Sequence, residues 1–339
     1  MLKNSMVPLA IIIVTVTGAV TAITLAYFAK RVPATGNQVE VLGSPTIIGD
    51  DGPSLNKPVS GNSNHYFTVL DETFIEADGP DGEDTYRIIR DQLCPDGDPS
   101  QPECIEAPDL YPNNHPGVRH IIENIGSPFG PYFTFVIHDV DKNKNYGDAS
   151  TMQRNEIKGY GGSPFRVLST EGQSYRYHWY FRIPINYYAS NTIMFQLHSV
   201  AEINEEQVGP IVKIESVGSN LVFRHDPDNC GDRNPGPGCN SEVLDLVPLS
   251  GLRGQWLEAE VFATYTNSGF LRMTIRDQTH AVVMAADRNK IDMWTSSNEN
   301  APFTRPKWGI YRGLSNTNSQ DTIDFADIRI QEISLHQPP

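Results

Sequence analysis

The chain has 339 residues and a formal net charge of −15, with 41 acidic residues against 26 lysines and arginines. This negative charge disfavours nucleic acid as a partner, although a local group of basic side chains could still bind an anionic polysaccharide. The 27 glycines and 25 prolines, together with apolar residues in short runs, favour one large domain of many strands joined by turns.

An apolar segment comes first in the chain. Residues 7–29 contain no charged side chain, and as a helix they would span about 35 Å, against about 30 Å for the hydrocarbon core of a bilayer. Lys3 precedes the segment and Lys30 and Arg31 follow it, so positive charge leaves its orientation open. No clean small-x-small cleavage site follows, which favours an uncleaved signal anchor over a secretory signal peptide for residues 1–31. If it is retained, this segment would hold the protein in a membrane.

Residues 32–63 are polar and contain Gly, Pro, Ser and Asn, which is typical of a flexible linker. We expect the folded domain to occupy residues 64–339. Within it, residues 78–109 are acidic and are predicted to form a loop.

Four cysteines form two local pairs, Cys94 with Cys104 and Cys230 with Cys239, in segments rich in Asp, Pro and Gly. A disulfide in each pair would close a loop of about ten residues and contribute about 2–3 kcal/mol in the chain-entropy model. Metal binding is less expected, because no CxxC spacing is present, and free thiols are the other alternative. We interpret both pairs as disulfides, which implies an extracellular or cell-surface domain.

Alternation of apolar and polar residues predicts strands through the rest of the chain. It is clearest in residues 174–182, where Tyr177 and Trp179 share the apolar face and His178 and Tyr180 share the polar face. Further strands are expected at residues 67–74, 133–138, 193–198, 210–216, 221–225, 256–265, 271–276, 281–285 and 322–335. The sequence therefore predicts an all-β fold, a two-sheet antiparallel sandwich of jelly-roll type.

Three short segments, each predicted to be a strand, carry side chains suited to chemistry. In a strand, residues two apart point to the same side. The residues that would share a face are Arg154, Glu156 and Lys158 in the first segment, Gln196 and His198 in the second, and Lys307 and Tyr311 in the third. If the three faces form one surface, it holds the groups needed to remove a proton next to a uronate carboxylate and to expel the glycosidic oxygen.

In this order, the three segments resemble the motifs of jelly-roll polysaccharide lyases, which include the alginate, glucuronan and heparin lyase families. Gln-Arg-Asn-Glu-Ile-Lys at residues 153–158 resembles their Arg-x-Glu strand, and Phe-Gln-Leu-His at residues 195–198 is similar to their Gln-x-His strand. Lys-Trp-Gly-Ile-Tyr-Arg at residues 307–312 resembles their Lys-x-Gly-x-Tyr strand. The resemblance covers about residues 65–337 and implies a lyase that cleaves a uronate-containing glycan by β-elimination.

The resemblance also implies catalytic roles. Arg154 and Gln196 would neutralise the developing enediolate, since a planar guanidinium fits a carboxylate. His198 would accept the proton in its neutral form. Tyr311 would protonate the leaving oxygen, or perform both proton transfers where the stereochemistry of the substrate requires it.

A second set of side chains is expected to bind substrate. Glu156 would orient Arg154 or Lys158 through an ion pair, and the lysines would bind sugar carboxylates in flanking subsites. The alternative for this strand is a salt-bridge ladder on a solvated face. The residues expected to bind substrate are Glu156, Lys158, His178, Tyr180 and Lys307, and His138 is a further candidate.

Cofactor chemistry is not expected, and we predict no catalytic metal. Residues 139–145 space their oxygens like a calcium loop but carry Lys144 at the sixth position and Ser150 at the twelfth, where such loops have Gly and Glu. An EF-hand site is therefore not expected. A structural calcium on Asp139 or Asp141 stays open.

Two other functions compete with the lyase. A non-catalytic, lectin-like carbohydrate-binding module on a membrane stalk would use the same surface without turnover. A glycoside hydrolase of the related laminarinase-like group would present a Glu-x-Asp-x-(x)-Glu strand with two carboxylates in reach of one sugar. Glu258-Ala259-Glu260 is the nearest string and lacks the rest, so the hydrolase is the least favoured.

Overall fold

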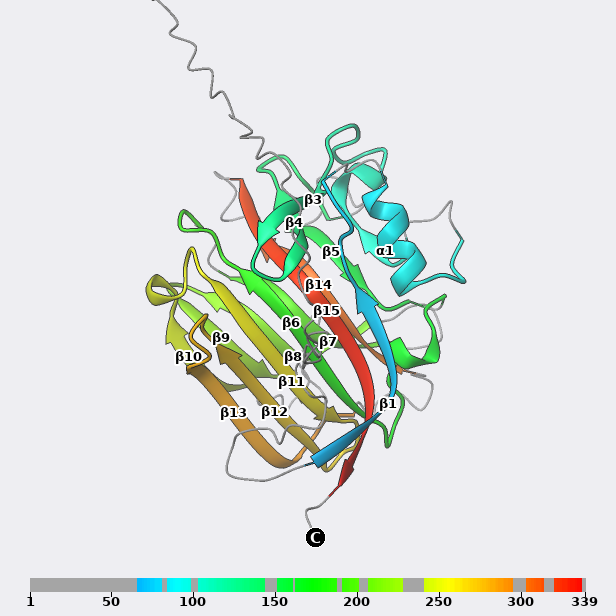
Figure 1. Ribbon diagram of the computed structural model, residues 1–339, viewed down its shortest axis with the longest axis vertical. Coiled ribbons are helices and arrows are strands. Elements are labelled where there is room, and N and C mark those ends of the chain that lie inside the picture. The colour runs from blue at the N-terminus through cyan, green and yellow to red at the C-terminus, as the bar shows by residue number, and fades with distance from the viewer. Residues whose placement is uncertain are drawn as a thin grey trace, which may run out of the picture. The chain divides into compact units, whose positions relative to one another are not determined.

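Two antiparallel sheets pack against each other in the computed structural model (Figure 1). It describes residues 66–80, 84–98, 103–143, 151–160, 162–187, 191–200, 207–227, 241–294, 303–313 and 320–336. Sheet A contains β1 (Tyr66–Ile75), β3 (Ile121–Ser127), β4 (Gly130–Ile137), β6 (Ser174–Arg182), β11 (Trp256–Thr264), β12 (Gly269–Arg276), β13 (Val282–Ile291) and β15 (Asp321–His336). Sheet B contains β2 (Ile105–Glu106), β5 (Met152–Lys158), β7 (Thr192–Val200), β8 (Gln207–Val217), β9 (Asn220–His225), β10 (Glu242–Pro248) and β14 (Phe303–Gly313).

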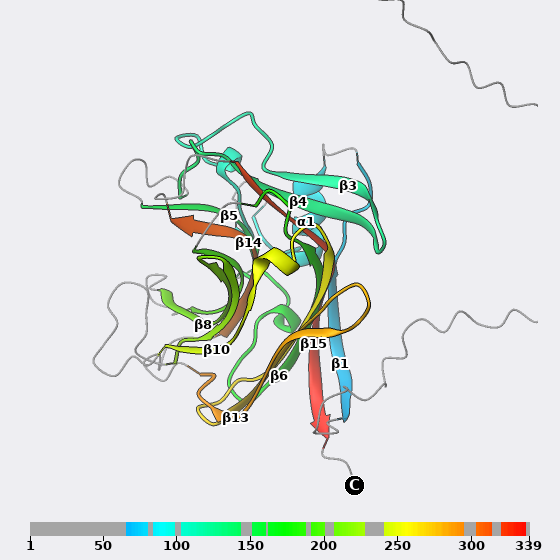
Figure 2. The same cartoon turned by 90° about the vertical axis from the view of Figure 1, so that its left-hand side faces the viewer.

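The strand order brings distant segments together. Sheet A follows the order β13-β12-β11-β6-β15-β4-β3, and β1 also pairs with β15, so the first and last described strands lie side by side (blue and red in Figure 1). Sheet B follows the order β10-β9-β8-β7-β14-β5-β2. Figure 2 shows the two layers from the side. The predicted two-sheet antiparallel β-sandwich is confirmed.

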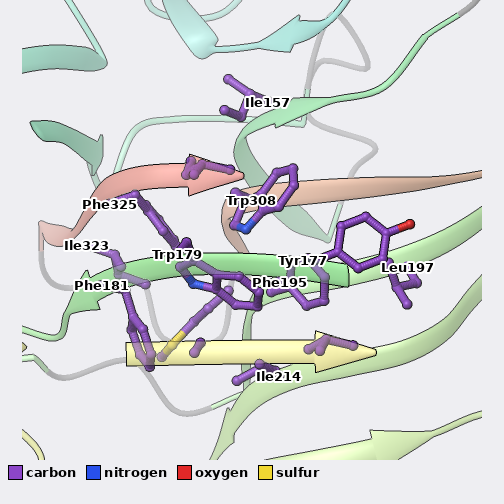
Figure 3. Close-up of a cluster of buried hydrophobic side chains, with 14 of the residues drawn as sticks. Ile157, Tyr177, Trp179, Phe181, Phe195, Leu197, Ile214, Trp308, Ile323 and Phe325 are labelled. Carbon is purple, nitrogen blue, oxygen red and sulfur yellow. The ribbon is translucent and has the colours of Figure 1, made fainter. Parts of the chain in front are cut away.

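The core between the sheets is built by alternate residues of facing strands, as the pattern of β6 predicts. Tyr177 and Trp179 of β6 are buried, and the ring of Trp179 lies 4.4 Å from that of Phe195 in β7 and 5.9 Å from that of Trp308 in β14 (Figure 3). Leu197 and Ile157 belong to the same buried cluster. The neighbours of these residues along β5, β7 and β14 must therefore point to the other side of sheet B, away from sheet A.

One helix interrupts the segment that was predicted to be a loop. The helix α1 spans Thr85–Leu93 and buries Tyr86, Ile89 and Leu93, which recur every three to four residues. This apolar stripe was hidden by the acidic residues on either side of it. Among the described residues there are also three short 3-10 helices, η1 (Pro108–Leu110), η3 (Phe165–Val167) and η4 (Leu249–Gly251).

The predicted disulfide between Cys94 and Cys104 is present and connects the end of α1 to the start of β2. The second pair, Cys230 and Cys239, lies outside the described residues, as do the predicted signal anchor at residues 1–31 and the linker at residues 32–63. Those assignments stay predictions. In the part of the chain that the structure describes, no helix has the length and apolar character required to span a membrane.

Candidate functional site

The three strands that carry the predicted site are neighbours in sheet B. β14 lies between β5 and β7, and residues directly opposite each other in antiparallel strands point to the same side. On the β5 side, Tyr311 is opposite Arg154 and Lys307 is opposite Lys158. Because Trp308 and Ile310 point into the core, Lys307 and Tyr311 belong to the opposite face of β14.

The pairing with β7 adds the remaining predicted residues. Lys307 is opposite Gln196, and His198 is opposite Arg305, which sequence reasoning did not select. We call this set the polar face of sheet B, and its members are Arg154, Glu156, Lys158, Gln196, His198, Arg305, Lys307 and Tyr311, together with Glu106 of β2. The structure thus brings the imidazole, the amide, the phenol and the basic side chains of the three motifs onto one face of sheet B, where every member of the set except Tyr311 is buried.

A glycine sets the spacing between Lys307 and Tyr311. Gly309 has φ of +141°, and a Cβ at this position would lie 2.2 Å from the carbonyl oxygen of Asn155 in β5. The pairing of β14 with β7 shifts its register between Trp308 and Tyr311, which is the mark of a local bulge. Only glycine permits this close approach of two backbones at a positive φ.

Glu106 is the central anion of the polar face. Its carboxylate accepts hydrogen bonds from Arg154 Nη1 at 2.8 Å and from Lys158 Nζ at 2.7 Å, and it lies 3.0 Å from Lys307 Nζ. The Glu106 side chain is fully buried. This role of Glu106 could not be predicted from the sequence, because a two-residue strand has no alternation to detect and Glu106 lies far from the motifs along the chain.

Glu156 forms a second anionic centre on this face. Its Oε1 accepts a 2.6 Å hydrogen bond from Gln196 Nε2, and its Oε2 lies 2.9 Å from Lys307 Nζ and 3.4 Å from Arg154 Nη1. Glu156 therefore joins β5, β7 and β14 through one carboxylate. Both carboxylates together balance only part of the positive charge that Arg154, Lys158, Arg305 and Lys307 bring to this face.

Arg154 and Tyr311 contact each other directly. The guanidinium carbon of Arg154 lies 4.2 Å from the centroid of the Tyr311 ring, a cation–π contact. Burial opposes the charged form of Arg154, yet the carboxylates of Glu106 and Glu156 outweigh it and raise the pKa of Arg154. The cation is thereby fixed in place beside the phenol.

Two buried donors on this face point to an anionic ligand. Among the described residues, neither Arg154 Nε nor Arg305 Nε has a hydrogen-bond partner, although both side chains are buried. Burial lowers the pKa of Arg305, and burial followed by repulsion from Arg154 lowers the pKa of Lys307. A negatively charged group at this face would satisfy the donors and reverse both unfavourable effects.

His198 is held as a neutral imidazole. Burial, followed by repulsion from Lys307 and Arg305, lowers the pKa of His198 well below 6.5. Its Nδ1 lies 2.8 Å from the carbonyl oxygen of Ser199, which can only accept a hydrogen bond, so Nδ1 carries the proton. The lone pair is then on Nε2, and this tautomer can accept a proton.

The prediction that His178 and Tyr180 line the same surface is wrong. Both belong to β6 of sheet A, where Tyr177 and Trp179 face sheet B, so His178 and Tyr180 point away from it. His178 Nε2 pairs with Glu258 at 3.0 Å, and the Tyr180 ring stacks on Phe129. Alternation separates the two faces of a strand but does not tell which sheet the strand joins.

Glu258 and Glu260, the nearest match to a hydrolase motif, also lie in sheet A. Glu258 pairs with His178, while Glu260 pairs with Arg176 at 2.8 Å. Each carboxylate thus has a basic partner of its own on the sheet opposite the predicted site.

His138 lies away from the polar face, in a group of possible metal ligands. We call His115, His120, His138 and Asp141 the histidine cluster, and one possible ligand atom from each lies within 4.8 Å of the others. Asp141, one of the two residues suggested for calcium, is surrounded here by imidazole nitrogens instead of the oxygens that calcium requires. Asp139 is exposed, and residues 144–150 of the suggested calcium loop lie outside the described residues.

Burial lowers the pKa of His138, which outweighs the attraction of Asp141. The pKa of His120 is raised to about 9, because hydrogen bonds to Asp109 and Asp141 overcome the effect of burial. The cluster is therefore a site of perturbed titration that the motif analysis did not detect.

Comparison with known proteins gives matches at the level of structure only. No protein family model matches the sequence, and no curated protein matches it. An endo-β-1,4-glucuronan lyase from the fungus Trichoderma reesei has a TM-score of 0.46 and 12% identity over 67% of this chain and 93% of its own. The family 14 alginate lyase from Aplysia kurodai has a TM-score of 0.46 and 8% identity over 80% of this chain and 100% of its own.

An alginate lyase from Pseudomonas aeruginosa is 16% identical over 59% of this chain and 82% of its own, with a TM-score of 0.39. These structural neighbours are jelly-roll polysaccharide lyases, the group that the three motifs resemble. The identities of these three matches lie between 8% and 16%.

Proposed function

We propose that the protein is a polysaccharide lyase that cleaves a uronate-containing glycan by β-elimination at the polar face of sheet B. One observation carries the proposal. His198, held neutral with its lone pair on Nε2, shares a face with the Arg154–Tyr311 pair and with buried guanidinium donors that lack partners among the described residues. A salt-bridge ladder alone would need neither the unprotonated imidazole nor the spare donors.

The chemistry follows from these groups. The proton on C5 of a uronate becomes removable only when the charge that develops on the adjacent carboxylate is stabilised. Arg154 would supply that stabilisation through its unpaired Nε, while Gln196, which donates to Glu156, would supply an amide N–H. A bound carboxylate would also offset the repulsion from Lys307 and Arg305 and raise the basicity of His198.

The elimination involves two proton transfers. The C5–H bond breaks and its proton moves to His198 Nε2, the electron pair forms the C4–C5 double bond, and the C4–O bond breaks. Tyr311 donates its phenolic proton to the leaving oxygen and recovers it from His198 or from water. For a substrate with the opposite stereochemistry at C5, Tyr311 would perform both proton transfers. Lys158 and Lys307 would bind the carboxylates of neighbouring sugars.

The cellular setting belongs to the same proposal. The disulfide between Cys94 and Cys104 is consistent with an extracellular protein. We propose that residues 1–31 anchor or export the chain, that residues 32–63 form a stalk, and that the sandwich is a jelly roll of the concanavalin A-like type. A second disulfide between Cys230 and Cys239 would fit this setting.

The test is an elimination assay with the full chain. The protein is mixed separately with alginate, glucuronan, heparin and pectate, and the ultraviolet absorbance of the unsaturated product is followed. Growth of this absorbance on any of the four establishes β-elimination. Binding of a polyanion without product would identify a lectin-like module instead and would refute the lyase proposal.

Two variants test the assignment of roles. His198→Ala and Tyr311→Phe should each lower kcat by at least about 10²-fold, the lower range for general acid–base groups. His225→Ala is a matched control, because His225 is also buried in sheet B but is paired opposite the core residue Val212. Full activity in both site variants would show that the reaction occurs elsewhere.

A further inference from the structure

The histidine cluster is assembled by a hairpin. β3 and β4 pair antiparallel, and the backbone N–H of Val136 donates to the carbonyl of His120 at 2.8 Å. His120 directly precedes β3 and His138 directly follows β4, so the open end of the hairpin brings the two imidazoles together. The centroids of the His115, His120 and His138 rings lie 4.9–5.2 Å apart, with interplanar angles of 72–89°.

The ligand atoms are spaced like the corners of a small coordination polyhedron. His120 Nε2 lies 3.1 Å from His138 Nδ1 and 2.9 Å from Asp141 Oδ2, and His138 Nδ1 lies 3.3 Å from that same oxygen. His115 Nδ1 lies 2.7 Å from Asp141 Oδ1. Metal–nitrogen bonds of about 2.0–2.1 Å in a tetrahedron imply edges of about 3.3 Å, close to the three separations among His120, His138 and Asp141 Oδ2.

A second layer of hydrogen bonds orients the cluster. His120 Nδ1 lies 3.1 Å from Asp109 Oδ1, which also accepts a 2.6 Å hydrogen bond from the hydroxyl of Tyr86. A carboxylate behind a ligating imidazole fixes its tautomer and leaves the other nitrogen for the metal.

Side-chain amides hold the loop that carries the carboxylate. Gln153 Nε2 donates to the carbonyls of His138, Asp139 and Asp141 at 2.7–3.0 Å. Asn114 exchanges two hydrogen bonds with the backbone of Lys142. This preorganisation of the loop lowers the entropic cost of placing the ligands around an ion.

We propose that the histidine cluster binds one zinc ion. Three imidazole nitrogens and one carboxylate oxygen suit zinc, whereas calcium requires six to eight oxygens. The side chains of His120 and Asp141 are fully buried, while those of His115 and His138 are 25% and 21% exposed, so an ion can enter from that side. With four protein ligands the site is structural.

The ion would lie beside the contact between the two sheets. His120 and His138 belong to the ends of a hairpin in sheet A, while Gln153 and Asn155, which hold the adjoining backbone, belong to β5 of sheet B. Zinc should therefore stabilise the contact between the hairpin and β5. This inference does not depend on the lyase proposal, because its readouts are metal content, spectrum and stability.

The experiment uses the full chain without a polyhistidine tag. The protein is dialysed against EDTA, then against zinc, and the metal content is measured after removal of free ion. We expect about one zinc per chain, bound at the histidine cluster, and a higher melting temperature than that of the EDTA-treated protein. Cobalt in place of zinc should give the strong visible bands of four-coordinate cobalt.

Two variants localise the site. His115→Ala and His138→Ala alter the partly exposed side and spare the buried His120, so both should fold. Loss of an outer partner of a ligand typically weakens metal affinity about 10–100-fold, so loss of a direct ligand should weaken it by more than about 100-fold. Asp109→Asn should fall within the 10–100-fold range. His336→Ala, which removes an exposed imidazole at the end of β15, should bind zinc like the wild type.

Three outcomes would overturn the proposal. The first is an unchanged zinc affinity when His115 and His138 are both replaced by Ala, which would place the ion elsewhere. The second is a melting temperature that calcium raises and zinc does not, which would favour oxygen ligands. The third is failure to retain any zinc, which would identify the cluster as a hydrogen-bonded network of three histidines and one aspartate.

Discussion

Replacement of Glu106 by Gln should cost more stability than any single surface change. The substitution keeps the shape of the side chain and removes one buried negative charge from among Arg154, Lys158 and Lys307, whose nitrogens lie 2.7–3.0 Å from its oxygens. At an effective dielectric constant of about 20, one contact at this distance is worth about 6 kcal/mol of attraction. In the wild type, the free-energy cost of burying the Glu106 carboxylate offsets much of the attraction from its three basic partners.

What remains in Glu106→Gln is an excess of buried positive charge. Breaking a buried ion pair by removing one partner costs about 3–5 kcal/mol, and three cations share this partner, so we expect a loss of at least about 3 kcal/mol in the free energy of unfolding. Urea unfolding followed by tryptophan fluorescence measures it, because Trp179 and Trp308 are buried between the sheets. The unfolding slope with urea should stay unchanged.

Glu242→Gln is the matched control. Glu242 is 52% exposed and lies 3.5 Å from Arg288, which is itself 39% exposed, so the same chemical change should cost no more than about 1 kcal/mol. Equal effects of the two substitutions, or a loss below about 1 kcal/mol for Glu106→Gln, would refute the view that Glu106 holds the polar face of sheet B together.

Two further predictions concern the same face. Gly309→Ala should lower the free energy of unfolding by about 2–4 kcal/mol, because the new Cβ would lie 2.2 Å from the Asn155 carbonyl oxygen at a positive φ. Gly251→Ala is the control and should be nearly neutral, because no atom lies within 4 Å of the Cβ that it adds. Equal melting temperatures of the two variants would contradict this explanation. The lowered pKa of His198 predicts that the acid limb of kcat/KM lies below pH 6.5 and that Lys307→Gln moves it upward. By linkage, the contribution of His198 to stability is present above about pH 6.5 and is lost as the pH falls toward its folded pKa; an acid limb at or above 6.5 would show that His198 is not the base.

Alternation along the chain was sufficient to predict the sandwich and the faces of its strands. The pattern in residues 174–182 separated the core residues of β6 from its polar residues correctly. The same rule placed His198, Lys307 and Tyr311 on the outer side of their strands. It could not predict which strands are neighbours, and so it assigned His178 and Tyr180 to a surface that belongs to the other sheet.

The features that the sequence did not reveal depend on contacts between distant residues. Glu106 reaches the polar face because two residues of β2 pair with Ile157 and Glu156 of β5. The histidine cluster forms because β3 and β4 close a hairpin, and β3 was not among the predicted strands. A histidine just before one strand and another just after the next would have been a usable signal once that hairpin was recognised.

β5 has a different partner on each of its faces. Arg154 and Glu156 point to the polar face, while Gln153 and Asn155 point to the other side and bind the backbone around the histidine cluster. Because the pleat separates the two sets, changes at His115 or His138 act on the polar face only through the position of β5. Substitutions on the polar face should therefore leave the zinc stoichiometry unchanged. Loss of zinc should lower the stability of the hairpin before it changes the tautomer of His198, because that tautomer is fixed by the carbonyl of Ser199 in β7.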